Sequence, residues 1–124
     1  MDADKLEPAR PHVQAARQAF AESRQTRIQA RDYALVVRQL PMLLQRHGLG
    51  QALAFLHVRG GGNINSPYEL VIRQMDRWLL AALGVGGRAF LPVLSGRDSR
   101  CYREATEQAW LFARALRACL EETP

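Results

Sequence analysis

The chain has 124 residues, of which 48% are hydrophobic and 23% charged, and its formal net charge at pH 7 is +5. No apolar run approaches the roughly 18 residues that a membrane span needs, and the acidic N-terminus lacks the apolar core of a signal peptide. The length suffices for one domain with its own core. We therefore expect residues 1–124 to form a single helical domain in the cytoplasm, with residues 1–10 as a disordered acidic N-terminus.

Positive charge is concentrated in the body of the chain and is carried by arginine. Sixteen arginines stand against one lysine, and residues 10–117 hold all sixteen with only seven acidic residues. Arginine makes planar, bidentate contacts with phosphate and stacks on bases, so this composition favours a nucleic-acid partner. A codon bias would also explain the ratio of arginine to lysine, but it would not explain the excess of positive charge.

The first region, between Pro11 and Leu40, is free of helix-breaking residues. Apolar residues at helical spacing over 13–21 and 28–40 indicate two buried faces, and the polar residues 23–27 between them predict a break. Arginine also recurs here every seven residues, a spacing that drifts only about 20° per repeat around a helix. One helix over 11–39 would carry a single basic ridge, whereas a break near residue 25 would give two basic faces. The arginines in question are Arg10, Arg17, Arg24, Arg31 and Arg38.

Residues 38–56, with the sequence RQLPMLLQRHGLGQALAFL, predict two short helices that pack against each other across a corner. Pro41 suits the first turn of a helix and strains a helix interior. Gly48 is the kind of residue that ends a helix, and Gly50 permits a close approach of the backbone. Since the corner has no obvious acid, base or nucleophile, we interpret it as architecture.

A third helical region follows a glycine-containing loop. Ser66 and Glu69 form a capping box with Pro67 at the first helical position. The apolar residues that follow, up to Leu83, are spread widely enough to be buried on more than one side, and Gly84, Gly86 and Gly87 end the helix. A further short helix or turn is expected within residues 88–97.

The last helix is predicted over residues 98–122. It carries an apolar stripe at helical spacing, and Trp110 falls off this stripe, either to widen the buried face or to meet a partner. Cys101 and Cys119 are too far apart on one helix to form a disulfide, so we expect two buried thiols. Because no alternation with period two appears anywhere, the fold class is all-α, a compact bundle of five to six short helices.

A family resemblance rests on the Leu-Pro pair at residues 40–41, the apolar turn after it and GLGQALAFL at 48–56. These features resemble the small subunit of type III-B CRISPR RNA-guided effector complexes (the Cmr complex). The resemblance extends over most of residues 12–120 and includes the last helix, although Ala113 stands where the first member of a basic pair is expected. The matching residues of that helix are Thr106, Glu107, Ala109, Trp110 and Arg114.

The resemblance implies a noncatalytic subunit that works in antiviral defence. Members of the family stack in a few copies along the complex and face the duplex of guide RNA and target RNA. The implied partners are therefore this duplex, the other Cmr subunits and further copies of the same chain.

No pattern in the sequence predicts catalysis. His12, His47 and His57 have no cysteine or carboxylate at metal-ligand spacing. Asp32 and Asp76 stand beside arginines, so we expect them to form surface ion pairs. We expect no enzyme activity, no cofactor, no metal and no small-molecule substrate.

Two other classes of function stay open as alternatives. A helix-turn-helix DNA-binding regulator would use residues 41–57, but residues 51–57 offer too few polar side chains to read base edges, and we expect them in the core. A helical protein–protein adaptor would bind through exposed aromatic residues and would have no affinity for RNA.

The charge pattern, rather than a residue-level family match, selects the candidate RNA-binding residues. Base pairing by the guide supplies specificity, so a protein surface needs only to neutralise phosphates. The alternative is that these arginines merely occupy the solvated sides of amphipathic helices, although only Glu22 and Asp32 supply acids among the first five. The candidates are Arg17, Arg24, Arg27, Arg31 and Arg38, with Arg114 and Arg117 on the last helix.

Overall fold

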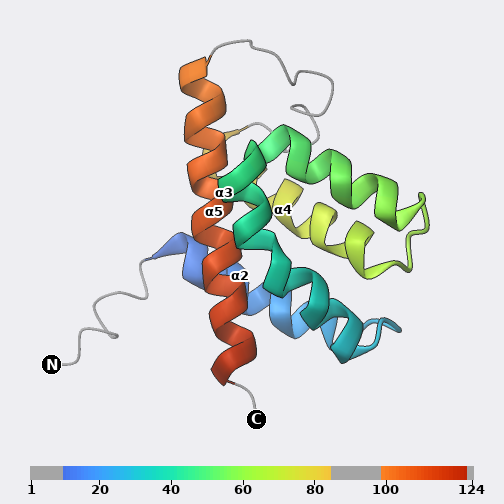
Figure 1. Cartoon of the computed structure of the whole chain (residues 1–124). Helices are drawn as coiled ribbons and strands as arrows, with labels where there is room; N and C mark the ends of the chain where they lie inside the picture. The colour runs from blue at the N-terminus through green and yellow to red at the C-terminus, as the bar shows by residue number, and fades with distance from the viewer. Residues whose placement is uncertain (1–9, 85–98, 123–124) are drawn as a thin grey trace, which may run out of the picture.

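The computed structural model describes residues 10–84 and 99–122, which form four α-helices. In chain order these are α2 (Pro11–Ser23), α3 (Ala30–Gly60), α4 (Pro67–Leu83) and α5 (Ser99–Glu122) (Figure 1). No strand occurs within these ranges, which confirms the all-α class. The N-terminus expected to be disordered, apart from Arg10, and the short helix expected within 88–97 lie outside the described residues.

The expected number of five to six short helices is wrong for the described part of the chain, because α3 continues where a separate short helix was expected to begin. Pro41 lies in the interior of α3, where it is buried. Its ring removes one backbone N–H donor, and the helix tolerates that loss while the ring is packed in the core. The break predicted over residues 23–27 is confirmed, since α2 ends at Ser23 and α3 begins at Ala30.

A sharp change of direction divides α3 at Gly48, as the sequence predicted. Gly48 has φ 80° and ψ 172°, a conformation that is almost restricted to glycine. The second half of the helix starts directly after it, so its first N–H groups have no partner within the helix. Side chains of α5 supply partners: the Gly50 amide donates to Tyr102 Oη at 2.8 Å, and the Leu49 amide donates to Thr106 Oγ1 at 3.3 Å.

Local signals set the ends of α4. The Ser66 hydroxyl accepts a hydrogen bond from the Tyr68 amide at 3.0 Å, and Gly84 ends the helix with a φ of 77°. The Glu69 carboxylate in the first turn lies 3.1 Å from His57 Nδ1, which ties the start of α4 to the last turn of α3. The predicted N-cap of this helix and its predicted end at Gly84 are therefore confirmed.

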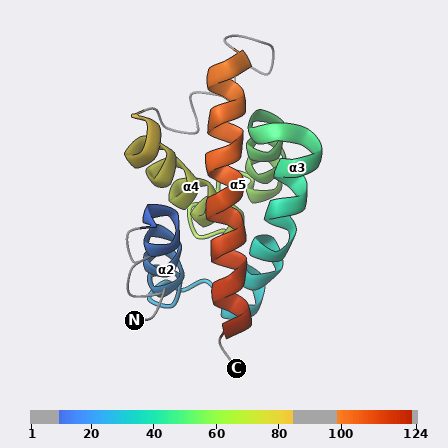
Figure 2. The ribbon, with the colours of Figure 1, turned by 90° about the vertical axis from the view of Figure 1, so that its left-hand side faces the viewer.

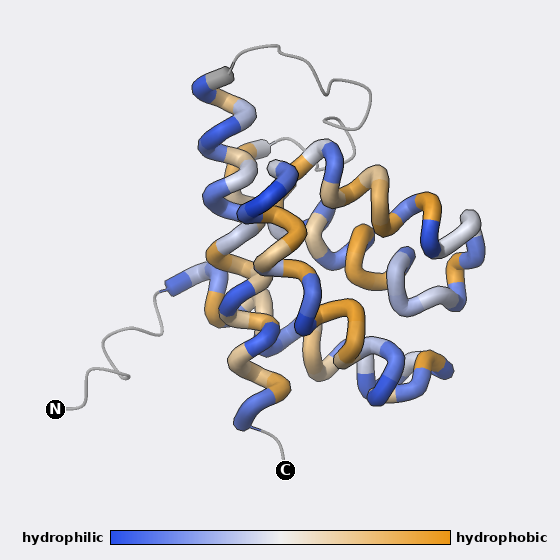
Figure 3. Tube along the Cα trace, viewed as in Figure 1, coloured by the Kyte–Doolittle hydropathy of each residue, from blue (hydrophilic) through white to orange (hydrophobic). Residues whose placement is uncertain are grey.

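The last helix, α5, lies across the other three helices and contacts each of them. It packs against α2 and α4 on one side and against α3 on the other (Figure 2). Buried apolar side chains of all four helices form one cluster, in which the rings of Trp78 and Phe112 stack with their centroids 6.1 Å apart. Hydrophobic and hydrophilic residues alternate along α3 and α5, as amphipathic helices require (Figure 3).

Most of the apolar stripe predicted on α5 is buried, including Ala105, Ala109, Phe112 and Leu116. The prediction of two buried thiols is wrong in one half, because Cys119 is buried but Cys101 is exposed. The N-terminal end of α5, which carries Cys101, projects past its neighbours (Figures 1 and 2).

Candidate nucleic-acid interface

All seven candidate arginines lie at the protein surface. The break between α2 and α3 separates the five arginines of the N-terminal region. Two lie on α2 or at its C-cap, one lies in the connection, and two lie on α3. The last two lie on α5, three residues apart and therefore on the same side of that helix. The exposed arginines are Arg17, Arg24, Arg27, Arg31, Arg38, Arg114 and Arg117.

Three of these arginines meet around one depression where α2 passes into α3. We call this depression, with a volume of about 380 Å³, the α2–α3 hollow. The connection that forms it lies at the same end of the molecule as the C-terminal end of α5, which contributes one apolar residue (Figures 1 and 2). The hollow is lined by Phe20, Ser23, Arg24, Ile28, Ala30, Arg31, Tyr33, Ala34, Arg38 and Leu120.

The guanidinium groups of Arg24 and Arg31, two of the arginines at the hollow, make only weak contacts with other protein groups. The guanidinium carbon of Arg24 lies 5.0 Å from the centroid of the Phe20 ring, and the residue is exposed. Arg31 Nε lies 4.0 Å from Asp32 Oδ1, and both side chains are at least half exposed. Exposed ion pairs of this kind contribute about 0–1 kcal/mol, so the predicted surface pairing of Asp32 does little to hold Arg31.

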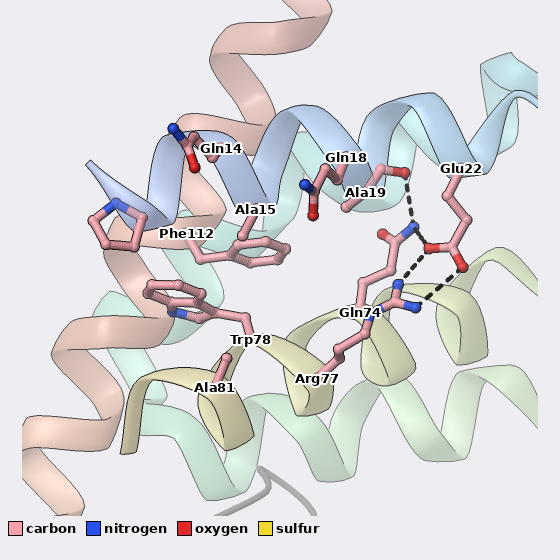
Figure 4. A pocket seen from close by; sticks show the side chains of 11 residues that line it. Gln14, Ala15, Gln18, Ala19, Glu22, Gln74, Arg77, Trp78, Ala81 and Phe112 are labelled. Carbon is pink, nitrogen blue, oxygen red and sulfur yellow. Dashed lines mark hydrogen bonds and ion pairs between the residues drawn. The ribbon is translucent and has the colours of Figure 1, made fainter. Parts of the chain in front are cut away.

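Glu22, the other acid that the sequence places among these arginines, is engaged on a different side of α2. Its carboxylate accepts hydrogen bonds from Arg77 and Gln74 of α4 (Figure 4). Burial tends to raise the pKa of Glu22, but these hydrogen bonds outweigh it and leave the pKa below its usual value. Arg77, one of the two arginines near Asp76 in the sequence, is thus an ion-pair partner of Glu22.

The remaining candidate arginines do not line the hollow. Arg17 lies close enough to the α5 end for its charge to counteract the rise in pKa that burial imposes on Cys119. Arg114 lies 4.7 Å from the centroid of the Trp110 ring, and Arg117 continues the same side of α5. The half-buried Trp110 borders a second, mostly apolar depression beside Gly48 and Tyr102.

A larger depression, of about 470 Å³, lies between α2 and α4. We call it the α2–α4 hollow; the rings of Trp78 and Phe112 lie between the two helices, and Gln14 and Gln18 of α2 are among its lining residues (Figure 4). The sequence reasoning did not identify this feature or the buried Gln74 at its edge. The signal available was a single amide within the apolar run of α4.

Gln74 connects three helices through its side chain, which is 1% exposed. Its Oε1 accepts from Tyr33 Oη at 2.7 Å, and its Nε2 donates to the Ala19 carbonyl at 2.9 Å and to Glu22 Oε1 at 3.0 Å. Burial raises the pKa of Tyr33 far above its usual value, so the hydroxyl stays protonated and donates this bond. The network is structural.

Other predictions about chemistry concern the histidines, membrane spans and the second half of α3. Among the residues that the structure describes, no group of three or more His, Cys, Asp and Glu side chains is placed to hold a metal ion. None of the helices in this part of the chain is long and apolar enough to cross a membrane. Residues 51–57 pack Ala52, Leu53 and Leu56 into the core, as we predicted when weighing a DNA-reading helix.

Comparison with known proteins gives one match. Residues 9–120 match the model of the family described as CRISPR-associated protein (Cas_Cmr5), which spans all four helices except the last two described residues. No curated protein and no solved structure matches the chain. Because the family model covers nearly the whole chain, the protein belongs to the Cas_Cmr5 family, the small subunits of the type III-B CRISPR (Cmr) effector complex.

Proposed function

We propose that this protein is a noncatalytic subunit that lines the duplex of guide RNA and target RNA through the arginines around the α2–α3 hollow. Family membership implies association with the other Cmr subunits. The proposal adds the RNA contact, further copies of the chain as neighbours, and a cytoplasmic role in antiviral defence. The noncatalytic part rests on the general character of the family.

One observation carries the RNA contact: Arg24, Arg31 and Arg38 come from two helices and meet around one hollow. A group of exposed guanidinium groups neutralises phosphates and releases counterions, and it does so without reading the sequence. Glu22, which would have weakened this group, is bonded to α4. A subunit on a guide–target duplex needs this kind of surface, because the guide itself selects the target.

The test compares two charge-reversed triple variants that lower the net charge equally. R24E/R31E/R38E changes the hollow, and R46E/R59E/R103E changes three arginines that are also exposed but are not among the candidates. Binding to a paired RNA duplex is measured over a series of salt concentrations. Each phosphate contact adds about 0.7–0.9 to the slope of log affinity against log salt. We therefore expect the hollow variant to lose about 2–3 of the slope and more than tenfold in affinity, and the control variant to lose much less.

Two results would contradict the proposal. A hollow variant that is folded by circular dichroism and binds like the parent would show that these arginines are only a solvated face. Equal losses in the two triples would show that only the net charge matters. An adaptor that binds proteins alone predicts no salt-dependent RNA binding by the parent chain at all.

A separate experiment tests the proposal that the protein does not cleave RNA. The purified protein is incubated with the duplex and with single-stranded RNA, with and without Mg²⁺, and the RNA is analysed for breaks. We expect intact RNA in every sample. Cleavage that stays with the protein through purification and is lost on changing Asp32, Asp76 or a histidine would overturn this part.

A further inference from the structure

The α2–α3 hollow has an apolar wall that phosphate neutralisation does not explain. Phe20, Ile28 and Leu120 are partly buried and line it together with the three arginines. A surface that contacts only phosphates gains nothing from apolar side chains in this position. The combination of an apolar wall and a cationic rim suits a ligand that is flat and apolar at one end and anionic at the other.

The size of the hollow limits the ligand further. Its volume of about 380 Å³ lies near the lower end of small-molecule pockets, which span about 300–1,000 Å³. Such a space admits one nucleotide but not a duplex, in which the base faces are stacked and hidden. Unpaired RNA bases are the ones that proteins bind on apolar, aromatic and arginine side chains. The exposed face of the Arg24 guanidinium, whose other face covers Phe20, is a stacking surface of this type.

The α2–α4 hollow is larger but lacks this combination. Among its lining residues the one arginine, Arg77, is paired with Glu22 (Figure 4). Its lining also includes three glutamines, Gln14, Gln18 and Gln74. The charge that would attract an RNA phosphate is therefore found at the α2–α3 hollow.

We propose that the α2–α3 hollow binds a single unpaired nucleotide of the RNA, with the base against the apolar wall and the flanking phosphates on Arg24, Arg31 and Arg38. This inference deepens the proposed function and rests on it. The polar side chains inside the hollow donate to protein groups, Ser23 Oγ to the Phe20 carbonyl and Tyr33 Oη to Gln74. The hollow therefore holds the base by shape and stacking, without selecting among the four bases.

The test uses two RNA probes, a fully paired duplex and the same duplex with one unpaired 2-aminopurine nucleotide in its centre. The variant A34W fills the hollow from α3 without changing the charge. The control A54W places the same side chain in a shallow depression beside Phe55, at another half-buried alanine of α3. If A34W does not fold, A30W fills the same hollow from an exposed position in the first turn of α3.

We expect the parent and A54W to bind the bulged duplex about five- to tenfold more tightly than the paired duplex, since stacking one base is worth roughly this factor or more. The 2-aminopurine fluorescence should change on binding. A34W should bind both probes alike, with the paired-duplex affinity and salt slope of the parent. Replacing 2-aminopurine by A, C, G or U should change the preference by less than about threefold.

The contradicting outcomes are distinct for the two proposals. A parent that binds both probes alike, or an A34W variant that keeps the preference, would overturn the hollow inference while the proposed duplex contact stands. Strong selection of one base would overturn the claim that the hollow does not read sequence. A parent that binds neither probe would contradict the proposed function itself.

Discussion

Gln74 shows how one polar side chain connects the fold to its surface. It lies in an apolar helix, is buried, and is bonded to Tyr33 of α3 and to Ala19 and Glu22 of α2. Buried polar groups cost free energy unless they are hydrogen-bonded, so the amide fixes α2, α3 and α4 in one arrangement. That arrangement sets where α2 ends, and hence where Arg24 stands relative to α3.

A double-mutant cycle between Gln74 and Tyr33 tests this role. Gln74→Leu keeps the size of the side chain but leaves the buried Tyr33 hydroxyl and the Ala19 carbonyl without this partner, so we expect a loss of about 2–4 kcal/mol in the free energy of unfolding. Tyr33→Phe should cost about 1–3 kcal/mol for the same reason. The double variant should cost less than the sum by about 1–2 kcal/mol, measured by urea unfolding. Additive losses would show that the two side chains act independently.

At the scale of elements, α3 shows that two helix-breaking residues can have different outcomes. Pro41 stays inside the helix, whereas Gly48 changes its direction. The difference lies in the backbone: glycine can adopt a φ of 80° and a ψ of 172°, and α5 supplies partners for the N–H groups that this exposes. Proline keeps a helical φ, so it removes a hydrogen bond without turning the chain.

Substituting alanine for Gly48 should destabilise the protein through two effects. Alanine disfavours this backbone conformation, and its Cβ would lie 2.8 Å from Tyr102 Oη. Gly61, the C-cap of α3, is a matched control because it also has a positive φ but no atom near the position of a Cβ. We expect Gly61→Ala to cost about 1 kcal/mol and Gly48→Ala to cost about 1–2 kcal/mol more, by thermal or urea unfolding. Equal costs would mean that neither the more restricted backbone conformation of Gly48 nor the contact with Tyr102 adds to the cost.

Helix ends were predictable from sequence where a local signal decides them. Pro11, the pair of Ser66 and Pro67, and Gly84 mark helix ends by their own geometry, and the structure places them there. Pro41 was not predictable as an interior residue, because packing of its ring in the core outweighs its local preference. The exposure of Cys101 depends on how far α5 projects beyond its neighbours. The position of the residue along the helix does not reveal this.

At the scale of the whole molecule, the candidate surface was only partly predictable. The sequence identified the exposed arginines, since charge and helical spacing are visible in it. It could not show that Arg24, Arg31 and Arg38 meet while Arg114 and Arg117 lie elsewhere, because this depends on the direction in which the α2–α3 connection turns. The apolar wall of the hollow combines residues 20 and 28 with residue 120, which is distant from both in the chain.

The two cysteines report on the stability of the whole bundle. Cys101 is exposed, whereas Cys119 is 8% exposed, and burial raises the pKa of its thiol. We expect a thiol reagent to label Cys101 rapidly in the native protein and to label Cys119 at least about 100-fold more slowly, because burial shields the Cys119 thiol and disfavours its reactive thiolate. Mass spectrometry distinguishes the positions, and Cys101→Ser isolates the slow one. Equal rates in the native protein would mean that the end of α5 detaches readily.

The corner in α3 also has a consequence for the order in which the protein forms on the ribosome. The hydroxyl groups that cap it belong to residues 52 and 57 positions further along the chain. At about 5–20 residues per second, roughly 3–10 s of translation separate the emergence of Gly50 from that of Tyr102. During this interval the N–H groups after Gly48 lack their hydroxyl partners from α5, and the other three helices lack the helix that contacts all of them. We expect native packing to wait until α5 has been synthesised.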